Sequence, residues 1–255
     1  TLIPVMTKGH NEHELGPIVR MGLSLDCVRH IEVHTMTYTG QSGIGFDRSG
    51  RISMDEVLEL VDAQLDPLLR RSDFVPSPCA HPLCYQIAYL LLDPEGGDPV
   101  PFLRFLDAET VYDCLGDHLY LEPSPRLERA FLDAIDRLWV EASAEAERTL
   151  RILKGLLRQM FPDKPLSRAD ALRVSERSVK AVYLHSHMDE ETFDAERVAM
   201  CCDSNCYADG TTIPVCSYNV LYRDTEDRFM TQPRMWGPRE GAMTPLVHIG
   251  ESSNG

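Results

Sequence analysis

Residues 198–219 read VAMCCDSNCYADGTTIPVCSYN, and this stretch holds four of the eight cysteines of the chain: Cys201, Cys202, Cys206 and Cys216. Between the third and the fourth of them, Ala208-Asp209-Gly210 has the composition of a turn that reverses a strand. The stretch therefore predicts a chain reversal that is surrounded by thiol groups.

A second pair of cysteines, Cys79 and Cys84, lies in residues 75–91, which read VPSPCAHPLCYQIAYLL. An iron–sulfur cluster needs four thiolates, and each stretch alone offers an incomplete or awkwardly spaced set. We therefore predict that the two stretches meet and hold one cluster, so that the fold depends on metal. Zinc held by four cysteines in a purely structural role uses the same residues, and the spacing leaves both metals open.

The composition indicates a globular chain. With 255 residues, of which 43% are hydrophobic, it is long enough for one large or two small cores. The net charge of -15, with 25 basic against 40 acidic residues, argues against a nucleic-acid partner, since phosphate contacts require clustered Lys and Arg. We find neither a run of 18 apolar residues nor a signal peptide, so we expect a cytoplasmic protein whose thiols are metal ligands or buried groups rather than disulfides.

The first 72 residues alternate strand and helix patterns, which is typical of a parallel sheet with helical crossovers. Ser53 followed by Glu56 predicts a capping box at the start of one of the helices. The chain begins without Met inside an apolar run, so we expect that an N-terminal part of the protein is missing. The predicted elements are strands at Leu2–Met6 and Val28–Tyr38 and helices at residues 12–24 and 53–69.

The pattern changes after residue 72. Prolines hold the chain extended around Cys79, and the apolar run Leu83–Leu92 predicts a helix. Two or more amphipathic helices in Leu127–Phe161 have the apolar stripe of an ordinary core. The remaining predictions are a strand at Val179–His185, a helix at Thr192–Met200, extended segments at Thr211–Val215 and Ser217–Tyr222, and a loosely ordered tail at residues 224–255.

The histidines are first given structural roles. His81 is expected to be a hydrogen-bonding neighbour of the metal centre rather than a ligand. His185 and His187 alternate on an extended segment, where they can pair with Asp189 or Glu190 or bind a metal. The chain has no H-E-x-x-H motif and no Ser-His-Asp order, so hydrolase chemistry has no positive support.

Four segments together carry a family resemblance: GHNEHELGPIVRMGL (9–23), HTMTYTG (34–40), CAHPLCYQIAYLL (79–91) and FDAERVAMCCDSNCYADGTTIPVCSYNVLYR (193–223). They resemble the C-terminal half of radical S-adenosylmethionine (SAM) proteins related to tetraether lipid synthase, a group that includes methanopterin-methylating radical enzymes. The resemblance covers residues 1–92 and 179–223 and does not extend to the middle helices or the tail.

The resemblance implies an α/β fold with three parts. Residues 1–72 would be the last strand–helix units of a partial (β/α)6 radical SAM barrel. Residues 73–223 would be a mostly helical, cysteine-containing domain with an auxiliary cluster, and residues 224–255 a tail. The family's C-x3-C-x2-C motif is absent from this chain, so we expect the chain to be inactive alone and the complete protein to be a radical SAM enzyme.

The resemblance also implies site residues. An auxiliary 4Fe-4S cluster would be held by Cys79, Cys84, Cys216 and Cys202, with Cys201 as the alternative to Cys202. Cys206 is an additional thiol outside the family pattern. The strand Val28–Thr39 resembles the final barrel strand, so SAM or the substrate is expected to contact three of its side chains: His34, Thr35 and Thr37. The complete protein would also carry SAM and a second 4Fe-4S cluster.

The resemblance implies radical chemistry on an unactivated C–H bond. Its first reading is carbon–carbon coupling of a lipid-like apolar substrate in lipid biosynthesis, with peripheral contact to a membrane. Its alternative is radical methylation of a pterin-like small molecule. Either reaction requires a reducing electron donor protein. A hypothesis of another class is a non-catalytic binding domain stapled by zinc.

Overall fold

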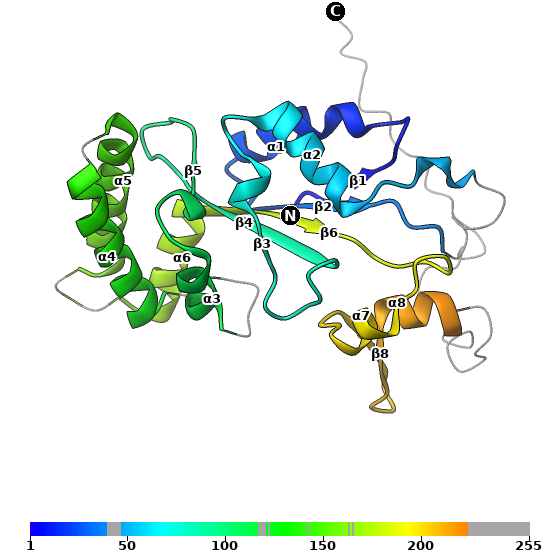
Figure 1. The fold of residues 1–255 in the computed structure, drawn as a ribbon. Helices are drawn as coiled ribbons and strands as arrows, with labels where there is room; N and C mark the ends of the chain where they lie inside the picture. The colour runs from blue at the N-terminus through cyan, green and yellow to red at the C-terminus, as the bar shows by residue number, and fades with distance from the viewer. Residues whose placement is uncertain are drawn as a thin grey trace, which may run out of the picture.

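The computed structural model describes residues 1–39, 47–116, 121, 123–141, 143–162, 164 and 166–223. Its centre is a mixed sheet with the strand order β1-β2-β6-β4-β3, and β5 pairs with the far end of β4 (Figure 1). β1, β2 and β6 are parallel, whereas β3, β4 and β5 run antiparallel to their neighbours. The strands are β1 (Val5–Met6), β2 (His30–Thr35), β3 (Val75–Pro76), β4 (Tyr85–Leu91), β5 (Val100–Pro101) and β6 (Val179–His185).

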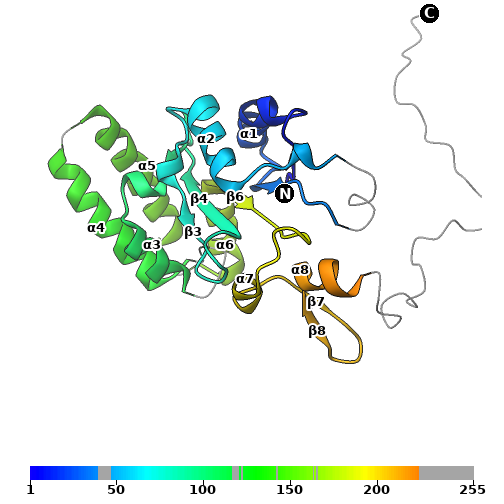
Figure 2. The ribbon, with the colours of Figure 1, turned by 45° about the vertical axis from the view of Figure 1, so that its right-hand side comes forward.

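Two helices, α1 (Leu15–Ser24) and α2 (Met54–Leu65), cover one face of the sheet (Figures 1 and 2). Successive strand residues point to opposite faces, so this core takes every second strand side chain, including Ile31 and Val33 of β2. The predicted capping box of Ser53 and Glu56 is confirmed at the start of α2. The sequence pattern changes after residue 72, but the sheet includes residues from both sides of this position. β2, which precedes it, pairs with β6, which follows it.

The opposite face is covered along part of its length by helices that lie between β5 and β6 in sequence: α3 (Ala108–Leu115), α4 (Pro125–Glu141), α5 (Ala144–Met160) and α6 (Arg168–Ser178). Phe131 and Leu153 of this group are almost fully buried against Tyr89 and Tyr183 of the sheet. The interpretation of the Leu127–Phe161 stripe as ordinary core is therefore confirmed. Short 3-10 turns complete the helical segments at Glu12–Glu14, Arg48–Gly50, Arg71–Asp73 and Phe102–Arg104.

The cysteine-rich segment follows β6 and lies under the end of the sheet that α3–α6 leave uncovered (Figure 2). A hairpin of β7 and β8 turns at Gly210, whose φ of +85° favours glycine. The segment comprises α7 (Ala195–Ala199), β7 (Ser204–Cys206), β8 (Thr212–Pro214), α8 (Val215–Ser217) and a π-helical turn at Tyr218–Tyr222. In the part of the chain that the structure describes, no helix is long and apolar enough to cross a membrane.

Two predictions of local structure are wrong. Leu83–Leu92 is not a helix, because Tyr85–Leu91 forms β4, the antiparallel partner of β6. A strand that is buried on both faces has no polar alternation, so its sequence resembles that of a buried helix. Ser217–Tyr222 is not extended, because α8 and the π-helical turn occupy it. The predicted tail lies outside the described residues.

Replacing Gly22 with alanine is expected to lower the free energy of unfolding by about 1–3 kcal/mol. A Cβ at Gly22 would lie 2.6 Å from Cγ1 of Ile31, a fully buried side chain that would have to shift within the core. Urea unfolding measures the effect. Gly155→Ala is the control: nothing lies within 4 Å of its Cβ position in α5, so this change is expected to add about 0.5–1 kcal/mol. Equal effects of the two changes would contradict the tight α1–β2 packing.

Candidate metal centre

Five cysteines from the two distant stretches lie together beneath the end of the sheet. Sγ of Cys79 lies 3.3 Å from Sγ of Cys202. Cys202 also lines a small cavity together with Cys84, Cys201 and Cys216. The structure thus brings together every cysteine that we predict as a ligand, including both alternatives at positions 201 and 202.

The thiols lie in or next to short elements at this end of the sheet. Cys79 lies in the turn after β3, where Ser77 Oγ is 3.1 Å from its Sγ, and Cys84 directly precedes β4. Cys201 and Cys202 follow α7, and Cys216 lies in α8. Antiparallel pairing of β4 with β6 sets the start of β4 beside the end of β6, where the cysteine-rich segment begins. The sheet register is therefore what joins the two stretches.

Two donors point at the sulfur atoms. Nε of Arg197 lies 3.3 Å from Sγ of Cys84, while its Nη2 donates to the carbonyl oxygens of Leu83 and Ser186. The backbone N–H of Met188 donates to Sγ of Cys216 over 3.3 Å. Hydrogen bonds of this kind stabilise a thiolate and tune a metal bound to it. Arg197 is buried, so its charge acts on Cys84 with little screening.

Burial opposes ionisation of these thiols in the metal-free chain. It raises the pKa of Cys216, and it raises that of Cys202 to about 12, with a further contribution from the neighbouring Cys79. A metal that binds here must displace these protons, so its apparent affinity rises with pH. The remaining cysteines do not line this cavity: Cys27 and Cys206 are exposed, and Cys114 lies in α3.

A cluster of histidines lies next to the thiols. His34 and His185 are register partners at the ends of β2 and β6, and His187 follows β6. One ring nitrogen from each of the three lies within 4.8 Å of the others. Glu32 supports the cluster from β2: its Oε1 lies 3.3 Å from Nδ1 of His185 and accepts a hydrogen bond from the hydroxyl of Tyr85.

The electrostatics of this cluster are those of a buried polar network. The hydrogen bond from His185 holds the pKa of Glu32 well below its usual range, whereas burial and the same carboxylate raise the pKa of Tyr85 above its usual range. Burial lowers the pKa of His185 and lowers that of His187 to about 3. At neutral pH the histidines 185 and 187 are therefore neutral and Glu32 is ionised.

The metal-free chain is expected to lose stability as the pH falls from 6.5 towards 3. His187 takes up its proton near pH 6.5 when unfolded but only near pH 3 when folded, so the unfolded state binds more protons between these values. The slope for one group is at most about 1.4 kcal/mol per pH unit. Urea midpoints at pH 7 and pH 5, measured with a chelator, check this. A His187→Gln variant should show the shallower pH dependence, and identical profiles would contradict the assignment.

The predicted cofactor-binding residues His34 and Thr35 are consecutive in β2, so their side chains point to opposite faces of the sheet. Thr35 is buried and donates from Oγ1 to Oγ of Ser186 over 3.1 Å, and it lines a hollow of about 340 Å³ with Arg51 and Asp189. His34, its neighbour in β2, belongs to the histidine cluster. Thr37 donates to the carbonyl oxygen of Thr35. Successive strand residues alternate between faces, so a ligand that contacts the side chain of His34 lies on the opposite face of the sheet from the side chain of Thr35.

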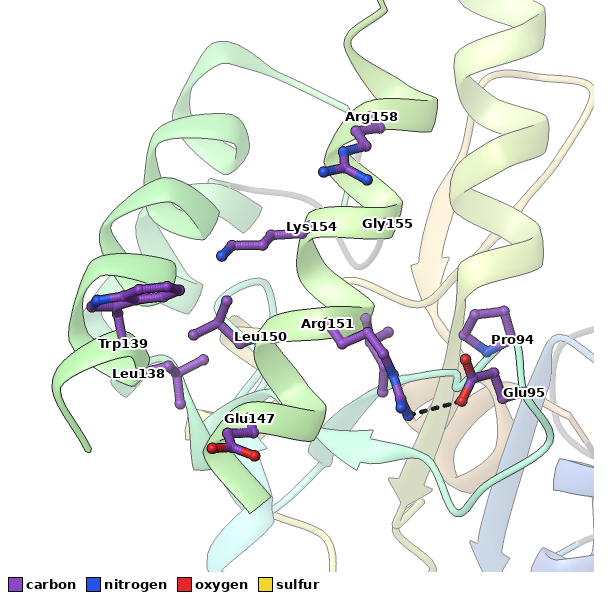
Figure 3. A pocket seen from close by; sticks show the side chains of 11 residues that line it. Pro94, Glu95, Leu138, Trp139, Glu147, Leu150, Arg151, Lys154, Gly155 and Arg158 are labelled. Atoms are coloured by element: carbon purple, nitrogen blue, oxygen red, sulfur yellow. Dashed lines mark ion pairs between the residues drawn. The ribbon is translucent and has the colours of Figure 1, made fainter. Parts of the chain in front are cut away.

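A larger hollow of about 740 Å³ lies between α4 and α5, at the opposite end of the molecule from the cysteines (Figures 1 and 3). Figure 3 shows Trp139 facing Lys154, whose Nζ lies 4.5 Å from the centre of the indole ring, and Arg151 paired with Glu95. Apolar side chains, among them Leu138 and Leu150, line this hollow together with the charged ones.

Sequence reasoning missed Glu32, Tyr85 and Arg197. A signal for Glu32 exists in the segment HIEVHT (30–35), where polar residues alternate with apolar ones in an otherwise buried strand. Arg197 gives no such signal. Its position in a short predicted helix is typical of an exposed residue, and only the structure shows that it is buried.

Comparison with curated proteins shows similarity to 7,8-dihydro-6-hydroxymethylpterin dimethyltransferase of Methanocaldococcus jannaschii, with 23% identity over 266 residues. The aligned region covers 92% of this chain and 51% of that protein, so the chain spans about half the length of the relative that it matches. No family model matches the chain. The chain is therefore a distant homologue of a pterin-methylating enzyme. Because the alignment covers nearly the whole chain, it includes both cysteine stretches.

Proposed function

We propose that the chain is the C-terminal part of a radical SAM methyltransferase that acts on a pterin-like small molecule, and that its cysteines hold an auxiliary 4Fe-4S cluster. The observation that carries the proposal is the convergence of five cysteines from two segments more than a hundred positions apart.

The donor set fits a cluster. Cys79, Cys84, Cys202 and Cys216 supply four soft thiolates, which is the number that a 4Fe-4S cluster requires. The N–H groups of Arg197 and Met188 point at two of these sulfurs, and such hydrogen bonds are a means by which proteins set cluster potentials. When bound, the cluster would supply one-electron chemistry, and the chain's own residues would position it and shield it from water.

The substrate part of the proposal rests on the relative. Its name describes dimethylation of a dihydropterin, which agrees with the methyltransferase alternative and gives no support to the lipid-coupling reading. We assign the substrate to the end of the sheet beside His34 and Thr35, because ligands of open α/β sheets bind at the carboxyl ends of the parallel strands. SAM, a second cluster and an electron donor protein belong to the complete enzyme under this proposal.

Anaerobic purification of the chain tests the cluster. We expect about four iron and four sulfide per chain and, after reduction, an electron paramagnetic resonance signal of a 4Fe-4S cluster. Tightly bound zinc without sulfide would contradict the iron–sulfur cluster and would favour a non-catalytic binding domain that zinc stabilises.

A separate assay tests the reaction. The complete protein, supplied with SAM and a reductant, is expected to add methyl groups to 6-hydroxymethyl-7,8-dihydropterin, as seen by mass spectrometry. A cluster-loaded complete protein that leaves the pterin unmodified would reject the substrate class while leaving the cluster assignment in place.

A further inference from the structure

We propose that His34, His185 and His187 form a second, mononuclear site for a divalent transition-metal ion such as Zn²⁺ or Fe²⁺, separate from the cysteine centre. The proposal does not rest on the function proposed above, since it uses none of the thiolates as ligands. Imidazole nitrogens suit zinc and first-row transition metals, and three histidines are an established catalytic ligand set.

The spacing of the ring nitrogens fits one ion. The three ligand atoms lie within 4.8 Å of one another. Tetrahedral coordination at ordinary metal–nitrogen distances places them about 3.3 Å apart. Because 4.8 Å is the upper limit of their separation, the approach needed is about 1.5 Å or less, and the strand register already pairs His34 with His185.

The network around the cluster prepares its members for a metal. Glu32 Oε1 sits 3.3 Å from Nδ1 of His185, which leaves Nε2 of that ring for coordination. A carboxylate on the far nitrogen is the usual support of a metal-bound histidine, because it fixes the ring and raises its basicity. Tyr85 donates to the same carboxylate and thereby fixes Glu32 in turn.

His34 supplies an independent observation. Its Nε2 is buried and has no hydrogen-bond partner among the described residues. The nitrogen does lie 3.1 Å from Oε1 of Glu32, but the contact lacks the geometry of a hydrogen bond. Buried polar atoms are almost always satisfied in folded proteins, so an unsatisfied ring nitrogen inside a histidine cluster points to a missing ligand.

The site has a place for a reactant. Three protein ligands leave at least one coordination position open. The cluster lies at the carboxyl ends of the parallel strands β2 and β6, and the side chain of His34 is 21% exposed. His187 connects this site to the thiols, since its Nδ1 lies 3.7 Å from Sγ of Cys216. A bound ion would thus sit beside the cysteine centre, within reach of a ligand that enters at the strand ends.

Cobalt(II) is the probe that separates the two centres in the 255-residue chain. Thiolate-bound cobalt gives strong sulfur-to-metal charge-transfer bands in the near ultraviolet, whereas cobalt bound to imidazoles gives visible ligand-field bands without them. We expect an imidazole-type component that saturates at one ion per chain in addition to any thiolate-type component.

Variants of the chain then identify which residues produce the imidazole-type component. His34→Ala is expected to abolish it and to leave the thiolate-type component and the far-ultraviolet circular dichroism unchanged. Glu32→Gln is expected to weaken the imidazole-type affinity by about 10–100-fold. His13→Ala, which alters an exposed histidine, is the control and should bind like the unaltered chain. Absence of the imidazole-type component, or its persistence in His34→Ala, would overturn the proposal.

Discussion

Replacing Cys216 with serine is expected to remove bound iron and sulfide from the anaerobically purified chain, whereas Cys27→Ser is expected to leave both unchanged. Cys216 is buried and lines the cavity with Cys84, Cys201 and Cys202, while Cys27 is exposed. Loss of one of four thiolates leaves the cluster incomplete, so the affinity for it should fall by at least the factor of about 10–100 that changes in the groups supporting metal ligands produce.

The same measurement decides between the two neighbouring cysteines. Cys202 Sγ contacts Cys79 Sγ at 3.3 Å, whereas the thiol of Cys201 lies 3.0 Å from the carbonyl oxygen of Asp203. We therefore expect Cys202→Ser to lose the cluster and Cys201→Ser to keep it. Loss of iron in Cys201→Ser with retention in Cys202→Ser would reverse the assignment, and full iron content in Cys216→Ser would contradict the site as a whole.

Replacing Lys180 with methionine is expected to lower the free energy of unfolding by about 3 kcal/mol or more. Lys180 in β6 is 3% exposed, and its ammonium group donates to the carbonyl oxygens of Gly22, Leu23 and Leu25 at 3.1, 2.6 and 2.9 Å. These carbonyls close the C-terminal end of α1, where a positive charge is favourable. Methionine fills the same volume but removes this donor from all three carbonyls, and only that of Leu25 is also bonded to the backbone N–H of Val28 among the described contacts outside the helix.

Urea unfolding measures this loss, as a lower midpoint with an unchanged slope. Lys8→Met is the matched control, because the Lys8 side chain is 54% exposed and forms an ion pair with Glu56 at the surface. Water and salt screen an exposed pair of this kind, so its loss is expected to change stability little. If both variants unfold at the same urea concentration, Lys180 does not hold α1 to the sheet.

The sequence predicted the elements whose patterns are local. Val179–His185 was predicted as a strand and is confirmed as β6, and the capping box at Ser53 is present. β4 was misread because its apolar run has no period, and only its pairing with β6 decides between strand and helix. The chemistry of thiolates was enough to predict that two distant stretches meet, since neither suffices alone.

Other features of the site depend on tertiary geometry. The thiols of Cys201 and Cys202 have different contacts, the first with the carbonyl oxygen of Asp203 and the second with Sγ of Cys79, and no spacing encodes this difference. The histidine cluster depends on the register of β2 against β6, two strands separated by more than 140 positions. Arg197 and Lys180 are charged residues that sequence patterns place at the surface, and their burial follows from partners elsewhere in the chain.

The position of β6 in the sheet has a consequence for biogenesis. β6 lies between β2 and β4, yet it follows both in sequence and is separated from β4 by the whole group α3–α6. During synthesis, the β1–β2 pair and the β3–β4 pair cannot join into one sheet until residues 179–185 have left the ribosome. Until then, the edges of β2 and β4 that pair with β6 are unpaired. Under the proposed function, the metal centre can assemble only after residues 201–216 have been synthesised, because Cys79 and Cys84 have no counterpart nearby before then.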